Sequence, residues 1–433
     1  MRKKLILVRT NFNNNIGLGH IYRTKKLSLE FESKNYQIIF LLDKFNYLDK
    51  KVIKYKKIYL YPNNKKFKNQ ADDAMITSKI CLKLKPSLII IDDYRLNSIW
   101  QKIIKINKFK TLSFRDHNIK HVSDFVVNMK WEGNNNISKK NHLIGPNFSV
   151  IDRGLRKKNK INKIKNFLIY AGGSGNLTKI LPILNSLKNI LNKNKITNLK
   201  FNIIIGPLSK FNFSYIKKYK SKYFNFVKDK YDINNLLNKT DLYFGVSSSI
   251  IYDLNYLNIP ALLYSTSSNQ KNKENFLEDQ GYYLNLENLN EPYKIAKLLL
   301  LMHSNYSRLK KMVNQKKIKV DKFGAKRIVN YVLNHVKKPD AKFNKNKIQI
   351  KNGLNKVPDK MINFYLKCRN QKTNRVVSGN SKQIKKIDHY IWWFSRKINK
   401  YFYYKNNKIK IFLSDEKIIY NKKKYYIGGL FKA

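Results

Sequence analysis

The sequence predicts an α/β protein in which two domains built on parallel sheets face one another across a cleft, followed by a small α+β module. Short apolar runs alternate with helix-period segments, this alternation restarts after a Lys/Asn-rich stretch at residues 157–166, and the composition changes after Lys337. Alternating strands and helices at this spacing are typical of parallel sheets with right-handed crossovers. The expected domains are residues 1–155, 165–336 and 358–433.

The first domain is predicted from five nearly unbroken apolar runs. Such runs are typical of strands buried on both faces. The expected strands are residues 5–8, 38–42, 88–91, 111–114 and 125–127, and the expected helices are residues 20–32, 72–83 and 97–107.

The second domain repeats the pattern, so both units are Rossmann-like and ligands are expected at the carboxyl ends of their strands. The expected strands are residues 167–170, 201–205, 223–227, 242–246 and 261–264. The expected helices are residues 177–191, 250–257, 271–280 and 293–302, with a last helix at about 307–336. Residues 361–433, rich in Tyr, Trp and Lys, form the third module.

The net charge of +62 comes from 89 Lys and Arg against 27 Asp and Glu, and only 12 of the 89 are Arg. Base readout and bidentate phosphate binding favour Arg. The charge therefore indicates compositional background, and we expect no specific nucleic-acid partner. The hydrophobic content of 42% is enough for sizeable cores, which argues against wholesale disorder.

The compartment is predicted from three absences in the sequence. Cys81 and Cys368 stand far apart and form neither a disulfide framework nor a zinc motif. The apolar stretch from Leu5 to Val8 is too short for a signal-peptide core. No run approaches the roughly 20 apolar residues of a membrane helix. We therefore expect a cytoplasmic protein, and we separately expect a monomer.

The first candidate site is the turn Asn13 to Arg23, NNNIGLGHIYR, after the first strand. Gly17 and Gly19 allow the backbone to approach a ligand closely, and the start of the next helix favours an anion. His20 lies at the mouth of this turn, where it could act as a general base, with Arg23 one turn later. A plain glycine-rich loop with a surface histidine is the alternative. One G-x-G without a third glycine is weak evidence for a dinucleotide site.

The second candidate site is the end of the strand at residues 88–91, where Asp92, Asp93 and Tyr94 follow. Polar residues at this rim of a parallel sheet usually line the ligand cleft. Ordinary capping of the next helix by Asp93 or Asn97 is the alternative.

Three further segments of the second domain could hold a nucleotide. Gly172, Gly173 and Ser174 form a phosphate-sized cradle without the lysine of a Walker A loop. Ser247, Ser248 and Ser249 open a helix that also carries Asp253, so that hydroxyls could hold a diphosphate and the carboxylate could accept from ribose. Helix capping by serine is the alternative there. Asn269 and Gln270 follow the last strand and could point into the cleft.

In this order and at these intervals, the segments resemble the UDP-2,4-diacetamido-2,4,6-trideoxy-β-L-altropyranose hydrolases of pseudaminic acid biosynthesis. That family is related to the MurG-type glycosyltransferases, which have the GT-B fold. The similarity covers about residues 5–281. It is carried by IGLGHIYRTKKLSLE, IDDYRLNSIW, LIGPNFSVID, AGGSGNLT and SSSIIYDLNYLNIPALL, followed by NQ and EDQG.

The resemblance implies a metal-independent and cofactor-independent reaction in which water attacks the anomeric carbon of a UDP-sugar with inversion, and UDP leaves. It implies that His20 is the catalytic base and that Tyr94 and Asn269 hold sugar or phosphate groups. The implied substrate-binding residues are Gly17, Gly19, Arg23, Asp93, Gly172, Gly173, Ser174, Ser248, Ser249, Asp253 and Gln270.

The sequence departs from the family pattern at three of these segments. The family's Asp-His-Tyr is Asp92-Asp93-Tyr94 here, and its Gly-Gly-Ser-Asp turn ends in Gly175. Its Gly-Gly-Ser-Thr…Glu motif reads Ser-Ser-Ser-Ile followed by Asp253, a side chain one methylene shorter. A related nucleotide sugar is therefore an open alternative substrate.

Residues 364–394 resemble the opening of GNAT-type N-acetyltransferases that modify amino sugars. The similarity is carried by Arg369, Asn370, Arg375, His389 and Trp393. The loop that would cradle the acetyl-CoA pyrophosphate does not follow, so we expect a partial GNAT-like module without acetyl transfer. A small aromatic core around His389 and the two tryptophans is the favoured interpretation.

Two alternatives to a hydrolase stay open at this point. A GT-B glycosyltransferase would keep the fold and replace water by a sugar hydroxyl. A non-catalytic binder of RNA or of an anionic membrane surface would concentrate arginines and aromatic residues on one face, whereas the lysines here are spread along the whole chain.

Overall fold

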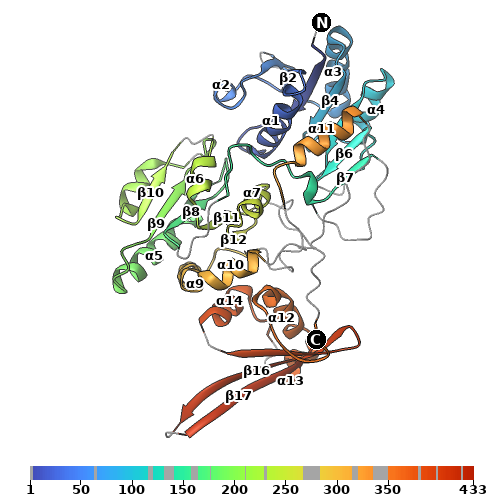
Figure 1. Ribbon diagram of the computed structural model, residues 1–433. Coiled ribbons are helices and arrows are strands. Elements are labelled where there is room, and N and C mark those ends of the chain that lie inside the picture. Colours follow the sequence, from blue (N-terminus) through green and yellow to red (C-terminus); the bar gives the residue numbers. More distant parts are fainter. Residues whose placement is uncertain are drawn as a thin grey trace.

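The computed structural model shows two parallel-sheet units and a smaller antiparallel unit (Figure 1). The order along the chain is the predicted one. The structure describes residues 3–62, 66–115, 120–130, 141–157, 164–175, 177–209, 211–228, 232–266, 283–314, 320–334, 350–378, 382–395, 398–420 and 423–433.

The first sheet contains seven parallel strands among the described residues, in the order β3-β2-β1-β4-β5-β6-β7. Its central strands are almost entirely buried, as expected for a sheet covered on both faces. The strands are β1 (Leu5–Thr10), β2 (Gln37–Leu42), β3 (Lys56–Tyr59), β4 (Leu88–Asp92), β5 (Thr111–Phe114), β6 (Phe125–Asn128) and β7 (His142–Ile144). The helices are α1 (Gly19–Glu32), α2 (Asp49–Val52), α3 (Gln70–Leu84), α4 (Ser98–Ile106) and the 3-10 turn η1 (Pro146–Phe148).

The second sheet is parallel as well, and its six described strands run in the order β10-β9-β8-β11-β12-β13. The strands are β8 (Asn166–Tyr170), β9 (Lys200–Ile204), β10 (Phe224–Val227), β11 (Leu242–Val246), β12 (Ala261–Tyr264) and β13 (Leu284–Leu286). The helices are η2 (Leu177–Lys179), α5 (Leu181–Lys193), η3 (Phe213–Tyr219), α6 (Asn234–Lys239), α7 (Ile250–Leu257), α9 (Pro292–Ser304), α10 (Tyr306–Asn314) and α11 (Gly324–Asn334).

The C-terminal unit is an antiparallel sheet of order β14-β15-β16-β17 with helices on one face. Its elements are β14 (Gly353–Lys356), η5 (Asp359–Met361), α12 (Ile362–Arg369), α13 (Lys372–Val377), α14 (Lys386–Ser395), β15 (Asn399–Lys405), β16 (Lys408–Tyr420) and β17 (Lys423–Lys432). Tyr365 of α12 packs edge-on against Phe412 and Phe431 of the sheet. The predicted small aromatic core is confirmed, because His389 and Trp393 are buried in this cluster.

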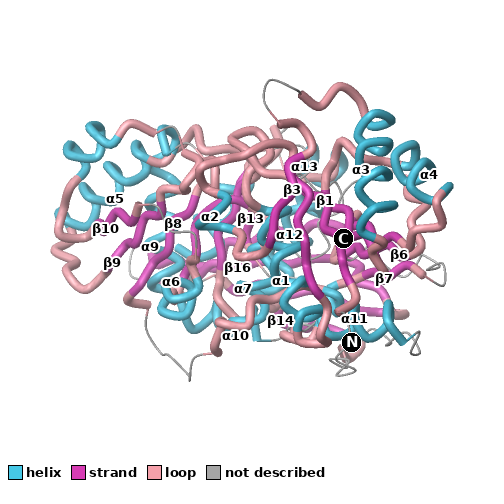
Figure 2. The backbone as a smooth tube through the Cα atoms, turned by 90° about the horizontal axis from the view of Figure 1, so that it is seen from above, coloured by secondary structure: helices cyan, strands magenta, loops and turns pink. Residues whose placement is uncertain are grey.

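The C-terminal unit shares a hydrophobic core with the second sheet. One buried cluster runs from residues of β8 and α9 to Tyr365, Tyr390 and Trp393. Helix α14 packs on α9, and Lys294 of α9 bonds Asp388 of α14 at 2.7 Å. Figure 2 shows the three units from above. The unit is therefore attached to its neighbour by packing as well as by the chain.

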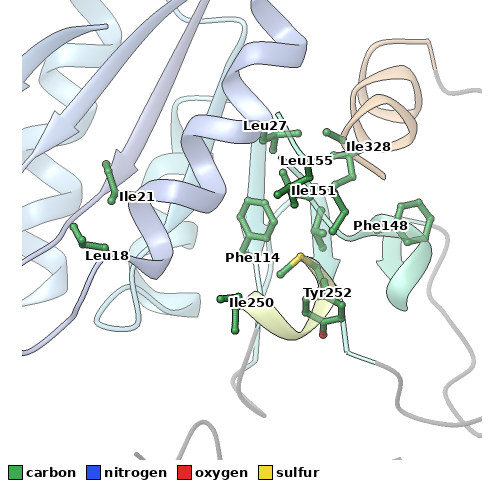
Figure 3. Packing of buried hydrophobic residues seen from close by; sticks show 14 of the residues in the cluster. Leu18, Ile21, Leu27, Phe114, Phe148, Ile151, Leu155, Ile250, Tyr252 and Ile328 are labelled. Atoms are coloured by element: carbon green, nitrogen blue, oxygen red, sulfur yellow. The ribbon is translucent and has the colours of Figure 1, made fainter. Parts of the chain in front are cut away.

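Helix α11 crosses back to the first sheet unit, where it packs on α1 and η1. A Cβ atom on Gly324 would lie 2.1 Å from the carbonyl oxygen of Ser149, so that only glycine permits this approach. The buried cluster around Leu27 and Leu155 takes in Ile328 of α11 together with Ile250 and Tyr252 of α7 (Figure 3). The two sheet units are thus joined through one continuous core.

Two predicted helices differ in the structure, and the short edge strands β3, β7 and β13 were not predicted. The helix expected at residues 177–191 begins at Leu181 after a 3-10 turn, with Pro182 in its first turn. The single helix expected at 307–336 is two helices, because the chain leaves α10 and turns before Gly324 to reach the first unit. Strand β3 was missed because Lys56 and Lys57 break its apolar pattern. The helix expected at 271–280 lies outside the described residues.

Among the described residues, no helix has both the length and the apolar character needed to cross a membrane.

Candidate functional site

Two glycine-rich turns, one from each parallel sheet, face each other. The turn after β1 is closed by a hydrogen bond from the Gly17 N–H to the Asn13 carbonyl at 2.8 Å, and Gly17 has a φ of +77°. A Cβ atom on Gly17 would lie 3.7 Å from the Ser174 hydroxyl oxygen, and one on Gly173 would lie 2.9 Å from the Leu18 side chain. The structure therefore brings together the predicted residues Gly17, Gly173 and Ser174.

His20 lies at the start of α1 and forms a buried cluster with Asp92 at the end of β4. The His20 Nδ1 atom lies 2.6 Å from Asp92 Oδ1. Arg23, one turn later on α1, donates to both oxygens of the same carboxylate, at 2.9 Å from Nε and 2.6 Å from Nη2. Parallel strands end at one edge of the sheet, which is why residues from β1–α1 and β4 meet here.

The Asp92 carboxylate is ionised in this cluster. Burial alone would raise its pKa, but Arg23 and His20 outweigh burial and hold the pKa below its usual value. An ionised carboxylate accepts a hydrogen bond, so it fixes the proton of the His20 ring on Nδ1. In the neutral form of the ring, the other nitrogen, Nε2, would then carry the lone pair that a general base requires.

Tyr94 packs its ring edge-on to His20, with 4.2 Å between the ring centroids. The tyrosine is 38% exposed whereas His20 is buried, so Tyr94 forms the outer wall of the histidine. The structure thus joins the first two predicted segments, the turn after β1 and the end of β4.

Asp93 points into a separate charge cluster. Arg95 donates to the Asp93 carboxylate at 2.5 Å and 2.9 Å, and it also bonds Asp43 at the end of β2. The Asp93 carboxylate is therefore paired with the arginine two residues later in the chain. Asp93 as a substrate-binding residue stays a prediction.

Sequence reasoning missed the other half of this charge cluster. Arg9 of β1 is fully buried and donates to Asp43 and Asp73, each at 2.6 Å. Trp100 also donates to Asp73, at 2.7 Å. Arg9 itself could have predicted this cluster, because a charged side chain within a buried, otherwise apolar strand needs buried partners of opposite charge. The cluster ties β1, β2, α3 and the β4–α4 loop together beneath the candidate site.

The turn after β8 presents backbone N–H groups. Gly172 has a φ of +90°, and the Gly173 carbonyl accepts from the Leu208 N–H at 2.9 Å. Within the described part of the chain, no acceptor meets the N–H groups of Gly173 and Ser174. Such N–H groups can bind phosphate oxygens.

The serines before α7 are not used as helix caps. Ser249 stands at the N-cap position but makes no side-chain cap bond, so the capping alternative fails there. Ser248 is half-buried and Ser249 is exposed. Asp253, on the same helix, bonds Lys26 of α1 at 3.3 Å through Oδ2, while no hydrogen-bond partner for Oδ1 is found among the described residues. Burial raises the pKa of this carboxyl, partly offset by Lys26.

Two predicted residues cannot be placed, since Asn269 and Gln270 lie outside the described residues. Gly19 begins α1 and has open space around the position of a Cβ atom. Within the described residues, no group of three or more His, Cys, Asp or Glu side chains could hold a metal ion.

Among the comparisons with known proteins, those with solved structures agree on the fold. No family model matches the chain. An uncharacterized protein of Methanocaldococcus jannaschii is 25% identical over 318 residues, which cover 65% of this chain and 62% of that protein. The chain thus spans less than two thirds of this relative.

Solved structures of similar fold include a UDP-N-acetylglucosamine 2-epimerase, with a TM-score of 0.55 at 12% identity, which covers 79% of this chain and 100% of that one. MurG of Acinetobacter baumannii has a TM-score of 0.53 at 11% identity, with 76% and 99% covered. The Neisseria meningitidis UDP-GlcNAc 2-epimerase bound to UDP-GlcNAc has a TM-score of 0.53 at 13% identity, with 76% of this chain and 99% of that chain covered. The chain therefore has the two-domain GT-B fold that these proteins share.

Proposed function

We propose that this protein hydrolyses a UDP-linked 2,4-diacetamido-trideoxyhexose by attack of water at the anomeric carbon, with inversion, in surface-glycan biosynthesis. The observation that carries the proposal is the His20–Asp92 pair beside the facing turns. The order of the sequence motifs supports this substrate, and the GT-B fold supports a UDP-sugar.

His20 would act as the base. Its Nε2 atom would take a proton from water while the water oxygen forms a bond to C1 of the sugar. The bond between C1 and the diphosphate oxygen breaks, and its electron pair leaves with UDP. Asp92 would stabilise the imidazolium that forms, because an adjacent carboxylate offsets the developing positive charge.

The second turn would hold the leaving group. The N–H groups of Gly173 and Ser174, with the hydroxyls of Ser248 and Ser249, could donate to the diphosphate as negative charge builds up. Asp253 could accept from the ribose hydroxyls, and Tyr94 with Asn269 could hold the sugar. No metal ion is required in this scheme, since these groups supply the donors.

A glycosyltransferase is the second candidate, because MurG has a similar fold. In addition, the proposed arrangement around C1 would allow a sugar hydroxyl to attack in place of water. The two candidates differ in what occupies the space beside His20 and Tyr94. An acceptor would have to displace the attacking water there.

The test incubates the purified full chain with UDP-linked 2,4-diacetamido-trideoxyhexoses, with and without sugar acceptors, in the presence of EDTA, and follows UDP release. Acceptor-independent release supports the hydrolase. Release that needs an acceptor supports the transferase instead. Absence of release from every UDP-sugar tested contradicts both candidates and leaves the non-catalytic binder.

A further inference from the structure

Arg23 lies on the same face of α1 as His20, because residues three apart in a helix are neighbours. Its guanidinium donates to the Asp92 carboxylate through Nε at 2.9 Å and through Nη2 at 2.6 Å. The guanidinium carbon lies 4.4 Å from the centre of the Phe114 ring, and the arginine is buried. The side chain is therefore held both by its donor edge and by its flat face.

One oxygen of the Asp92 carboxylate serves both neighbours. Oδ1 lies 2.6 Å from Nδ1 of His20 and 2.6 Å from Nη2 of Arg23. All three side chains are buried, so water screens their charges little. Burial would raise the pKa of Asp92, and the charge of Arg23, ahead of that of His20, lowers it. A change of charge on Arg23 must therefore affect the histidine through the shared carboxylate.

The charges of these three side chains decide which form of the imidazole is favoured. With a neutral imidazole, the carboxylate and the guanidinium cancel, whereas a protonated imidazole would add an uncompensated positive charge. Without the guanidinium the balance reverses, because the carboxylate would then pair with an imidazolium. An uncompensated charge is costly in a buried site. Arg23 therefore favours the neutral ring of His20, which is the form that can accept a proton.

Other groups around the ring do not oppose this effect. Tyr94 contacts the ring edge-on, and a phenol is ordinarily uncharged near neutral pH. Arg115 follows β5 directly, at the same edge of the sheet, and is positive as well. Charged side chains of the elements around α1 are paired outside this cluster, as are Arg9 with Asp73, Lys26 with Asp253, Asp93 with Arg95, and Arg327 with Asp321.

We propose that Arg23 is a positioning residue for the reaction, which anchors Asp92 and keeps His20 neutral near neutral pH. The inference rests on the proposed role of His20 as the base. It gives Arg23 a task different from the substrate contact that the resemblance implies, because Nε and Nη2 are bonded to Asp92. Arginine suits this task, since its planar fork can donate to both carboxylate oxygens at once.

The first test needs no substrate. Wild type and Arg23→Met are prepared with ¹³C-labelled histidine, and NMR follows each imidazole as the pH changes; the signal missing from His20→Gln identifies His20. The midpoint of its titration should lie about one pH unit or more higher in Arg23→Met, because the loss of a charge this close has effects of that size. Lys34→Met removes an exposed positive charge about 20 Å away, beyond the end of α1, and should leave the midpoint unchanged.

Two further variants separate charge from geometry. Arg23→Lys keeps the positive charge, so the midpoint should stay within about half a pH unit of the wild-type value. In Arg23→Met with Asp92→Asn the negative charge is removed too, so the midpoint should return to the wild-type value or fall below it. This double variant has no uncompensated charge in the cluster, which keeps the test decisive if Arg23→Met alone does not fold. Circular dichroism checks the folding of each variant.

The second test follows UDP release. The acidic limb of kcat/KM against pH reports the base of the free enzyme. In Arg23→Met this limb should move to higher pH by the same amount as the NMR midpoint, so that part of the activity lost at pH 7 is recovered at higher pH. A purely structural loss would instead lower activity equally at every pH.

An unchanged His20 midpoint in Arg23→Met overturns the proposal, and so does a raised midpoint that persists in the double variant. A higher KM for the UDP-sugar with an unchanged pH profile would assign Arg23 to the substrate instead. If no UDP-sugar is turned over, the proposed function fails, while the NMR titration still decides whether Arg23 keeps His20 neutral.

Discussion

At the scale of single residues, His20 shows what the sequence could and could not reveal. Its place at the mouth of a glycine-rich turn predicted a base, but the partner that fixes its tautomer lies 72 residues away. Asp92 and Asp93 are adjacent acids, and nothing in the sequence around them distinguishes their roles. Their opposite side-chain directions on the rim give Asp92 to His20 and Asp93 to Arg95.

Removing the base should abolish most of the activity. His20→Ala should lower kcat for UDP release on the order of a thousandfold, and Asp92→Asn should lower it by about a hundredfold through the wrong tautomer. Both are measured by steady-state UDP release. Unchanged Kd for UDP in calorimetry serves as the control for folding, because the proposed UDP contacts lie on the other unit. Activity that survives His20→Ala would contradict the role of this residue.

Lys400 provides a pH test of the C-terminal unit. It is buried against Trp392 and Trp393, and burial lowers its pKa from 10.5 to about 8. Between these values the unfolded chain binds more protons than the folded one, so the charge of this residue opposes folding less as the pH rises.

Lys400→Met should therefore stabilise the unit on the order of 2 kcal/mol at pH 7, and this advantage should vanish by about pH 10.5. Thermal unfolding followed by tryptophan fluorescence, with wild type and variant at each pH, measures the difference. A constant difference across the range would show that Lys400 is not charged and buried as described.

At the scale of elements, strands were predicted well and helix starts less well. Buried strands such as β4 and β11 have uninterrupted apolar sequences, so their bounds follow directly. Strand β3 lies at a sheet edge, where lysines are tolerated and the apolar signal fades. The two glycine-rich turns were recognisable individually, but their contact depends on how the units pack.

The contact between the turns can be tested with one methyl group. In Gly173→Ala the new Cβ would lie 2.9 Å from the Leu18 side chain, so either this side chain or the turns must shift. We expect UDP release to fall about tenfold, since a small misplacement of reacting groups is costly.

The double variant Gly173→Ala with Leu18→Ala removes most of the contacted side chain and should recover activity relative to Gly173→Ala alone. Leu18→Ala by itself is the matched control. If the two substitutions prove additive in kcat, the turns do not meet in the active protein.

At the scale of the whole molecule, the path of the chain after α10 was not predictable. The apolar periodicity of residues 307–336 suits one helix, whereas the structure takes α11 back to the first unit, where Arg327 bonds Asp321 and the Asn147 carbonyl. The one indication in the sequence was the glycine at position 324. Glycine is needed there because a Cβ atom would collide with the backbone of Ser149. Local patterns define elements, while such long-range contacts decide how the units are joined.

Gly324→Ala should weaken the packing of α11 on the first sheet unit. Its Cβ would collide with the Ser149 carbonyl, so α11 must shift, and we expect a loss of about 2 kcal/mol in the free energy of unfolding. Urea unfolding measures it, with Asn334→Ala at the exposed end of α11 as control. Equal stability of the two variants would show that the helix does not pack closely on η1.

The most direct test of the proposed reaction follows the oxygen of the attacking water. The full chain is incubated with a UDP-linked 2,4-diacetamido-trideoxyhexose in ¹⁸O-labelled water, and the products are analysed by mass spectrometry. Attack at the anomeric carbon, with His20 as base, predicts the label on the C1 hydroxyl of the released sugar and unlabelled UDP. Label in the β-phosphate of UDP would place the attack at phosphorus and contradict the account.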